Sequence, residues 1–186
     1  MRLQADALTI EIIPEDFRYD PSSADNIRTY ERAYRLGDPQ SSVHGVKVYA
    51  DEHLIASAVL IAGGGASGVH ERTVLVAPSV IYVAVGDHVV CLSLPTLELA
   101  WATQTDWATC FGVHAIPGST DVLSHGEVEI ARVNNSGRIL WSTSGKDIFT
   151  GEIAIDDQTV KAVDFEGESY VFDLLTGKPL TGQQFA

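Results

Sequence analysis

Four glycines close together in the chain are the first residues whose spacing could do chemistry. Gly63, Gly65 and Gly68 satisfy the pattern G-x-G-x-x-G after an apolar run, as in loops that hold the pyrophosphate of a dinucleotide. Such a loop must open a helix, whose N-terminus then binds the phosphates. The following residues, VHERTVLVAP, are rich in β-branched types and end at Pro78, so they predict a strand. The cluster therefore predicts a bulged connection between strands, and a ligand-binding loop is the alternative.

Three of the six histidines, with two glutamates, supply the other groups that could bind a ligand. A metal site needs three or four converging side chains, and the sequence has no H-x-x-x-H or C-x-x-C pair. His125 and Glu127 are two residues apart, which places both on one side of a strand. We therefore predict no metal ligands, although the distant loops of a repeat fold can meet at one end and form a pocket. The candidate ligand-binding residues are Gly63, Gly64, Gly65, Gly68, His70, Glu71, His114, His125 and Glu127.

Two side chains, those of Cys110 and Ser124, could act as nucleophiles beside a histidine. Neither lies in an elbow such as G-x-S-x-G, and Ser124 and its neighbour His125 would point to opposite faces of a strand. We therefore assign no catalytic residue. Cys91 lies in an apolar strand-like run, and two cysteines make no disulfide framework in a chain of this size. We expect both thiols to be free and buried.

Size and charge restrict the class of protein. A chain of 186 residues is one domain with room for a substantial core. Its 12 basic and 25 acidic residues give a net charge of -13, which opposes binding to nucleic acid and to anionic membranes. The longest apolar run, at residues 55–62, is shorter than the roughly 20 residues that span a bilayer. The N-terminal segment lacks the cleavage site of a signal peptide, so we expect a cytoplasmic protein. The acidity either serves solubility or faces a basic protein partner.

Trp101 and Trp141 are 40 residues apart, and each closes a segment that reads strand, turn, strand. The strings are LPTLELAW and NNSGRILW, and LLTGKPLT repeats the frame without a tryptophan and ends at Thr181. Polar turns with glycine separate the strands of each unit. One unit cannot bury both faces of its small sheet, so the units must stack and the tryptophans must pack between them. A change of parity at residues 128–133 predicts a β-bulge in the middle unit.

The residues before these repeats predict further elements. Residues 7–13 alternate as a first strand, and residues 43–50 and 54–62 form a hairpin. Apolar residues recur at helical spacing between a serine cap and Gly37, which predicts one short helix at residues 24–36. The single domain 1–186 then divides into an N-terminal strand and helix, an irregular first β unit and three β repeats, at residues 1–42, 43–78 and 79–182.

Two strings, VIYVAVGDHVVCLSLPTLELAW and FEGESYVFDLLTGKPL, resemble the repeat of quinoprotein-like (PQQ-like) β-propellers. Blades of that family read strand, Gly-Asp turn, strand, Thr-Gly turn and a closing tryptophan. The resemblance covers residues 80–182 and implies antiparallel blades around an axis. At about 40 residues per blade the chain holds four at most, fewer than the enzymes that bind pyrroloquinoline quinone, so we expect no cofactor. The chain is also similar to small bacterial proteins with propeller-like repeats.

The fold class predicted is all-β, with antiparallel propeller-like blades of ~40 residues in three clear units and an irregular N-terminal one. We expect a non-enzymatic interaction module, and an inhibitor or immunity-type protein that neutralises a basic partner is one form of it. The alternative is a small metal- or ligand-dependent enzyme that uses the glycine-rich loop and the clustered histidines. Exposed strand edges need a cover, which a homodimer could supply.

Overall fold

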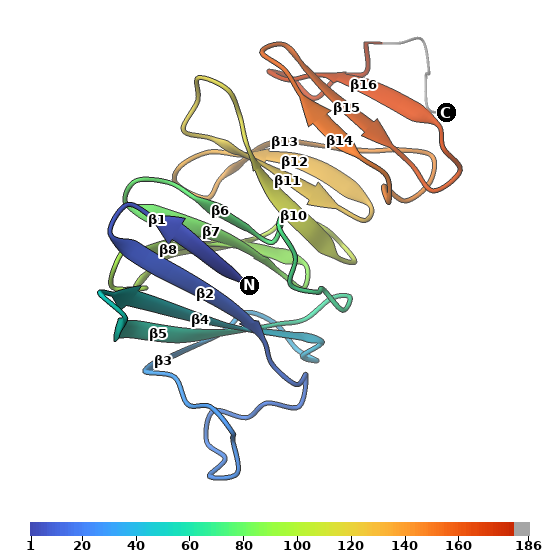
Figure 1. The fold of residues 1–186 in the computed structure, drawn as a ribbon. Helices are drawn as coiled ribbons and strands as arrows, with labels where there is room; N and C mark the ends of the chain where they lie inside the picture. Colours follow the sequence, from blue (N-terminus) through green and yellow to red (C-terminus); the bar gives the residue numbers. More distant parts are fainter. Residues whose placement is uncertain (181–186) are drawn as a thin grey trace.

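The computed structural model describes residues 1–180, and these form sixteen β-strands without an α-helix (Figure 1). No helix in this part of the chain is therefore long and apolar enough to cross a membrane. The strands form four sheets, which are stacked in chain order with the first and fourth sheets at opposite ends (Figure 1). The predicted all-β class with repeated antiparallel units is confirmed.

The first sheet is built from the N-terminal third of the chain and has the strand order β1-β2-β4-β5-β3. Its strands are β1 (Arg2–Ala5), β2 (Leu8–Pro14), β3 (Arg32–Arg35), β4 (Ser42–Ala50) and β5 (His53–Ala62). The predicted first strand corresponds to β2, and β4 with β5 forms the predicted hairpin. The sequence does not predict β3, which pairs with β5 in parallel, whereas the other pairs of this sheet are antiparallel.

The next three sheets each continue the chain as an antiparallel meander. The second sheet contains β6 (Val74–Val76), β7 (Val80–Val85), β8 (His88–Ser93) and β9 (Leu99–Gln104). The third contains β10 (Cys110–Ala115), β11 (Val122–Gly126), β12 (Glu129–Val133) and β13 (Ile139–Ser144). The fourth contains β14 (Ile153–Ile155), β15 (Thr159–Val163) and β16 (Ser169–Asp173). Thr181, the end of the last repeat string, lies outside the described residues.

Three apolar layers fill the spaces between the four sheets. In β7, Ile81 and Val83 face the first sheet. The alternate residues Tyr82 and Ala84 face the third sheet, as the alternation of side chains along a strand requires. Because both faces of a middle sheet are buried, its strands read as nearly continuous apolar runs. Each layer contains fully buried side chains. They are Ile12, Leu60 and Leu92 between the first and second sheets, Val89, Cys110 and Val133 between the second and third, and Leu123, Phe149 and Phe172 between the third and fourth.

Two irregularities interrupt the pairing of the third sheet. The register between β12 and β13 shifts at Arg132 and Val133 because β13 carries an extra residue, Leu140. The middle repeat therefore contains a bulge, but it lies on β13 and not at residues 128–133, which pair regularly with β11 where they face it. A second shift lies between Cys110 and Gly112, where β10 pairs with β11. The residue between them, Phe111, lines a pocket at the end of the sheet. A bulge can redirect a side chain in this way.

One aromatic side chain on the edge strand of each of the first three sheets hydrogen-bonds to the following sheet. The donors and their acceptor carbonyls are Tyr34 with Leu97 (2.9 Å), Trp101 with Asn135 (3.0 Å) and Trp141 with Leu174 (3.1 Å). Each acceptor lies in the turn that follows the third strand of its own sheet. The packing role predicted for Trp101 and Trp141 is therefore confirmed, and Tyr34 extends it to the first sheet.

The helix predicted at residues 24–36 is wrong. The carboxylate of Asp20 accepts a hydrogen bond from the backbone N–H of Ser22 (2.9 Å), a local bond that favours a turn over a helix start. The end of the segment pairs instead with the exposed edge of β5 as strand β3. Ile27, which would face the core in a helix, is 94% exposed.

Residues 15–31 instead cover the outer face of the first sheet. The ring of Tyr30 lies over Gly45, where it occupies the space that a Cβ would need. The Tyr30 hydroxyl donates to the carboxylate of Glu15 (2.5 Å). Together with Tyr19 it closes a small apolar cluster over the sheet residues Val43, Val59 and Ile61.

Candidate functional site

The glycine cluster connects β5 to β6 and packs against the loop at residues 105–109. Gly65 donates its N–H to the carbonyl of Ala108 (2.6 Å). At Gly64, whose φ is +78°, an added Cβ would lie 2.5 Å from the same carbonyl oxygen. The predicted connection between strands is confirmed. A strand follows it, so no helix N-terminus stands here to bind a pyrophosphate.

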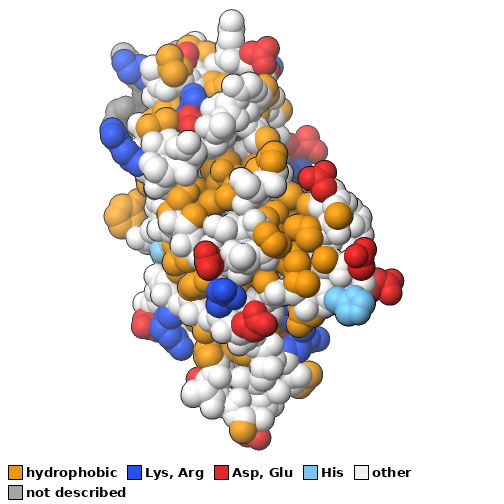
Figure 2. All heavy atoms as spheres, turned by 90° about the vertical axis from the view of Figure 1, so that its left-hand side faces the viewer, with side chains coloured by type: hydrophobic (Ala, Val, Ile, Leu, Met, Phe, Trp, Pro, Cys, Tyr) orange, Lys and Arg blue, Asp and Glu red, His pale blue; other side chains and the backbone are white. Residues whose placement is uncertain are grey.

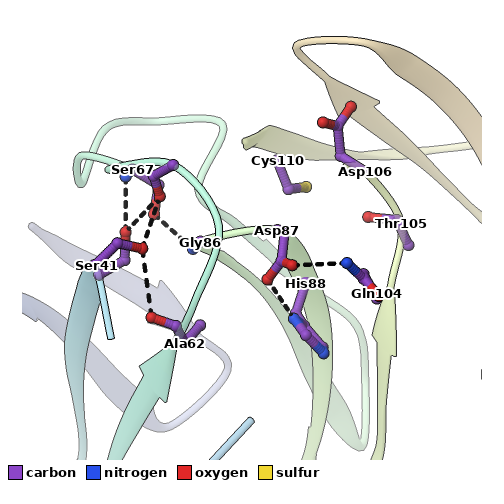
Figure 3. A network of polar contacts seen from close by, with 12 residues as sticks. Ser41, Ala62, Ser67, Gly86, Asp87, His88, Gln104, Thr105, Asp106 and Cys110 are labelled. Carbon is purple, nitrogen blue, oxygen red and sulfur yellow. Dashed lines mark hydrogen bonds and ion pairs between the residues drawn. The ribbon is translucent and has the colours of Figure 1, made fainter. Parts of the chain in front are cut away.

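Polar contacts around this connection join the first sheet to the second (Figure 3). Ser67 donates its backbone N–H to the hydroxyl of Ser42 (2.7 Å), and its own hydroxyl accepts the N–H of Gly86 (2.8 Å). On the adjoining hairpin, Asp87 Oδ1 lies 2.6 Å from His88 Nδ1 (Figure 3). Because these groups bind one another, the network serves to hold the two sheets together.

The candidate nucleophiles lie in the apolar layer between the second and third sheets. The Ser124 hydroxyl donates to the hydroxyl of Thr105 (2.7 Å) and lies 3.3 Å from the sulfur of Cys110. Both cysteines are free and buried, as predicted. Burial raises the pKa of the Cys110 thiol, and it raises the pKa of Cys91 to about 11. A substrate would have to enter the core to reach any of these groups.

The three predicted histidines come together at one end of the third sheet. A pocket of about 180 Å³, named here the histidine pocket, is lined by His70, Arg72, Phe111, His125, Thr150 and Gly151. His114 lies beside this pocket, because its ring centroid is 5.9 Å from that of His125. The predicted glycines do not line it. The structure therefore brings the histidines together and leaves the glycine cluster apart from them.

The two predicted glutamates do not line the histidine pocket either. Glu71 is exposed. Glu127 donates its backbone N–H to the carbonyl of Thr109 (2.7 Å), and its own carbonyl accepts the N–H of Phe149 (2.7 Å). Its backbone thus joins the third sheet to the loops that precede and follow it.

The fold determines how the side chains of the histidine pocket are placed. His125 lies near the end of β11, and Phe111 occupies the bulge of β10. The backbone of Arg72 runs along the edge of β10, where its carbonyl accepts the N–H of Val113 (2.9 Å). This approach requires a glycine at position 112, because a Cβ on Gly112 would lie 2.9 Å from the Cβ of Arg72.

His114 and His125 are neutral near pH 7. Burial is the main reason that the pKa of each is lowered to about 4. The neighbouring His125 lowers the pKa of His114 further, and the positive charge of Arg72 lowers the pKa of both histidines. The carbonyl of Phe149 partly opposes this lowering at His125, although it does not meet the geometry of a hydrogen bond.

Hydrogen-bonding groups of the pocket histidines are buried without protein partners. The exposed fraction of His125 is 3%, and among the described residues neither of its ring nitrogens has a hydrogen-bond partner. Nε2 of His114 also has none within residues 1–180. A neutral imidazole carries one donor and one acceptor, and buried groups of this kind are normally satisfied. The pocket therefore has hydrogen-bonding capacity for a ligand.

A metal ion fits this pocket poorly. The part of the chain that the structure describes contains no group of three or more His, Cys, Asp or Glu that could hold a metal. The imidazoles of His70, His114 and His125 do not form such a group, and the positive charge of Arg72 beside the last two opposes a cation. The arrangement suits an anion better.

Three recesses lie at the opposite end of the strands. Val122, at the start of β11, lines one of them, whereas His125, near the end of the same strand, lines the histidine pocket. The recesses measure about 480 Å³ between the first and second sheets, about 530 Å³ between the second and third, and about 490 Å³ between the third and fourth. They follow one another along the stack and are named here the inter-sheet groove.

Shared residues make the inter-sheet groove continuous. Val76, Ala77 and Pro78 line both the first and the second recess. Ser119 lines both the second and the third. Figure 2 views this end of the strands, and hydrophobic side chains gather in the middle of the face with acidic and basic ones around them.

Charged residues along the groove are mostly acidic. Asp6 lines the first recess, Asp121 the second, and Asp157 and Asp173 the third. The only basic lining residue within the described part of the chain is Arg132, which binds Asp121 at 2.7 Å. The first two recesses therefore combine mostly apolar walls with acidic residues, and the third is lined mainly by polar and charged groups.

Comparison with known proteins supports the fold and goes no further. No protein-family model matches the chain, and no curated protein matches it either. The computationally designed Ika8 protein is similar with a TM-score of 0.55 and 16% identity, over 78% of this chain and 46% of its own. A europium-containing methanol dehydrogenase is similar with a TM-score of 0.50 and 19% identity, over 61% of this chain and 24% of its own. The designed Ika4 protein is similar with a TM-score of 0.51 and 15% identity, over 64% of this chain and 79% of its own.

These identities show the fold alone. The chain spans less than half the length of Ika8 and of methanol dehydrogenase. The similarity to methanol dehydrogenase agrees, at the level of the fold, with the resemblance of the repeats to those of quinoproteins.

Sequence reasoning misses Arg72 and the inter-sheet groove. The only signal for Arg72 is its place two residues after His70 in an acidic chain. The groove walls include the turns at Pro78 and at Pro117 and Gly118, which the sequence marks as turns. Whether such turns enclose an apolar recess depends on how neighbouring sheets stack, and no local pattern encodes that.

Proposed function

We propose that the chain is a non-enzymatic binding module that holds an extended, basic segment of another protein in the inter-sheet groove. The observation that carries the proposal is the groove itself, a series of connected recesses with acidic residues along them, of which the first two have mostly apolar walls. An inhibitor or immunity-type protein that neutralises a basic partner would be one form of such a module.

The dimensions of the groove favour an extended segment. Each recess, at about 480 to 530 Å³, lies within the range of roughly 300–1,000 Å³ found for ligand sites in proteins. Because the recesses follow the stack, a segment that crosses the sheets would place successive side chains in successive recesses. Apolar pockets for alternate side chains are a common basis of peptide recognition.

The charge of the groove favours a basic segment. Lysine or arginine side chains of a partner would meet the carboxylates of Asp6, Asp157 and Asp173. Arg132 opposes this little, because Asp121 already pairs with it. The net charge of -13 would also attract a basic partner before contact, most strongly at low ionic strength.

The contacts between sheets hold the groove walls in place. Asn135, which accepts the indole N–H of Trp101, lines the second recess. Leu174, which accepts that of Trp141, lines the third. Walls that are already ordered lose little conformational freedom when a ligand binds, which favours affinity.

Fluorescence anisotropy with labelled peptides tests the proposal. The probe is a peptide in which lysine alternates with leucine, and the control carries glutamate in place of lysine. We expect only the lysine peptide to bind, and its dissociation constant to increase at least about tenfold from low to high salt, because the attraction is electrostatic. Equal binding of the glutamate peptide would contradict the proposal.

A pair of variants locates the binding surface. Ala77→Arg introduces a long cation into the first and second recesses and should abolish binding. Ala24→Arg makes the same change of charge at an exposed position outside the groove and should leave the affinity unchanged. Binding that persists in A77R would place the partner elsewhere. If the protein forms a dimer that A77R abolishes, the groove is occupied by a second copy of this acidic chain, which would also contradict a basic partner.

A further inference from the structure

We propose that the histidine pocket binds a small oxyanion, such as a phosphate or carboxylate group. The pocket lies at the other end of β11 from the inter-sheet groove, and this proposal does not depend on the proposed function. Three observations carry it. They are an arginine without an ion pair, a histidine whose Nδ1 already accepts a hydrogen bond so that its Nε2 can donate one, and buried imidazole nitrogens without partners.

Arg72 supplies the positive charge. Among the ion pairs formed within residues 1–180, none includes Arg72, although the chain has 25 acidic residues. Arg132, which is partly buried like Arg72, binds Asp121 at 2.7 Å. A guanidinium is always charged, and it binds carboxylate or phosphate oxygens through two parallel hydrogen bonds. An unpaired arginine that lines a pocket is therefore suited to an oxyanion.

His70 supplies a donor at the mouth of the pocket. Its Nδ1 accepts the backbone N–H of Arg72 (3.2 Å). Because a neutral imidazole carries a single proton, this bond places that proton on Nε2, which then acts as a donor. His70 is exposed, so the donor is accessible to a ligand that approaches from solvent.

His125 supplies buried hydrogen-bonding groups at the base of the pocket. The residue is 3% exposed and lines the pocket, and its ring nitrogens have no hydrogen-bond partner among the residues described. A buried donor without an acceptor costs free energy that a suitable ligand would recover. An oxygen atom of an anion would provide that acceptor, while the Arg72 side chain binds the same anion from the edge of β10.

The surroundings of the pocket favour an anion over a metal ion. None of its lining residues is acidic. The charged and titratable groups that face the His125 ring are Arg72 from the loop before β6, His70 from the same loop and His114 from β10. Arg72 repels a cation, and the guanidinium and the imidazoles can donate hydrogen bonds to an anion.

Anion binding should depend on pH in a defined direction. In the free protein the pKa values of His114 and His125 are lowered to about 4, so both rings are neutral at pH 7. A bound negative charge favours the imidazolium form and raises both pKa values, so the complex takes up protons. The affinity should therefore increase as the pH falls from neutrality toward 5.

Isothermal titration calorimetry tests the proposal on the full chain. Sulfate is the probe for the pH dependence because its own charge is constant over this range, and inorganic phosphate and malonate compare the two classes of oxyanion. We expect binding that becomes tighter at lower pH. Tighter binding of phosphate assigns a phosphate group to the natural ligand, and tighter binding of malonate assigns a carboxylate.

Two arginine variants provide the matched comparison. Arg72→Gln removes the pocket guanidinium and should weaken sulfate binding at least tenfold. Arg138→Gln removes the same charge from an exposed position outside the pocket and should change the affinity less than twofold. In the unmodified protein, imidazole NMR signals of His114 and His125 should shift with sulfate, while that of His53, the exposed first residue of β5, should not.

Several results would overturn the oxyanion site. No binding of sulfate, phosphate or malonate at millimolar concentration, or equal affinity in R72Q and the unmodified protein, would exclude it. Tight binding of Zn²⁺ that shifts the same histidine signals and prevents anion binding would assign the pocket to a metal instead.

Discussion

At the scale of single residues, Gly137 and Gly177 let the tryptophan of the preceding sheet lie against a turn. Both have a positive φ, of 83° and 70°. A Cβ added to them would lie 2.8 Å from Trp101 and 2.6 Å from Trp141, respectively. Gly167 also has a positive φ, of 85°, but nothing lies within 4 Å of a Cβ added there. Comparison of Gly167 with Gly177 therefore separates backbone strain from steric overlap.

We expect Gly177→Ala to lower the free energy of unfolding by about 2–4 kcal/mol, because strain of about 1–2 kcal/mol adds to an overlap with Trp141 of similar size. Gly167→Ala should lower it by about 1–2 kcal/mol, from strain alone. Urea unfolding followed by tryptophan fluorescence measures both values. Equal losses would show that the Trp141 ring moves aside freely and does not hold the turn.

The histidine pocket shows which residues of a candidate site can be identified from sequence. His70, His114 and His125 are identified because few residue types bind ligands, and a repeat fold brings distant loops together at one end. Arg72 cannot be identified in this way, because an arginine indicates an anion site only when no acidic side chain pairs with it. That property depends on where all 25 acidic side chains lie, which no local pattern specifies.

At the scale of elements, alternating apolar residues and turn residues correctly predict the N-terminal strand, the hairpin and the repeats. The segment before them fails because Ile27, Tyr30 and Tyr34 have helical spacing without sharing a face. Tyr30 packs on the outer face of the first sheet, whereas Tyr34 binds the carbonyl of Leu97 in the second sheet. The backbone groups on the free edge of β5 form hydrogen bonds with this segment. The need to pair them cannot be read from the local sequence of residues 24–36.

Two substitutions test whether residues 15–31 act as a cover over the first sheet. Ile27→Asp should change the free energy of unfolding by less than about 0.5 kcal/mol, because the side chain is 94% exposed. Tyr30→Ala should lower it by about 2–4 kcal/mol, because the ring fills the space over Gly45 and its hydroxyl bonds to Glu15. Denaturant unfolding measures both. A large loss in I27D with a small one in Y30A would support an amphipathic helix here.

At the scale of the whole molecule, the four sheets form a nearly one-dimensional stack in which each apolar layer joins two neighbours. The inter-sheet groove and the histidine pocket lie at opposite ends of the strands, and the packed layers separate them. In such a stack, stability arises from each sheet and from its contacts with the next. A local defect should therefore act mainly on its own layer and on the sheets beside it.

Hydrogen exchange measured by mass spectrometry tests this independence. Phe172→Ala empties a fully buried site between the third and fourth sheets and should lower the free energy of unfolding by about 3–5 kcal/mol. Ile12→Ala empties one between the first and second sheets and should lower it by about 2–5 kcal/mol. We expect F172A to accelerate exchange most in β14 to β16, and I12A most in β1 to β5, because each opening remains local. If either variant accelerates exchange equally in all four sheets, the stack opens as one cooperative unit. The two proposed binding surfaces would then depend on a common folding equilibrium, because a defect in one layer would open all four sheets.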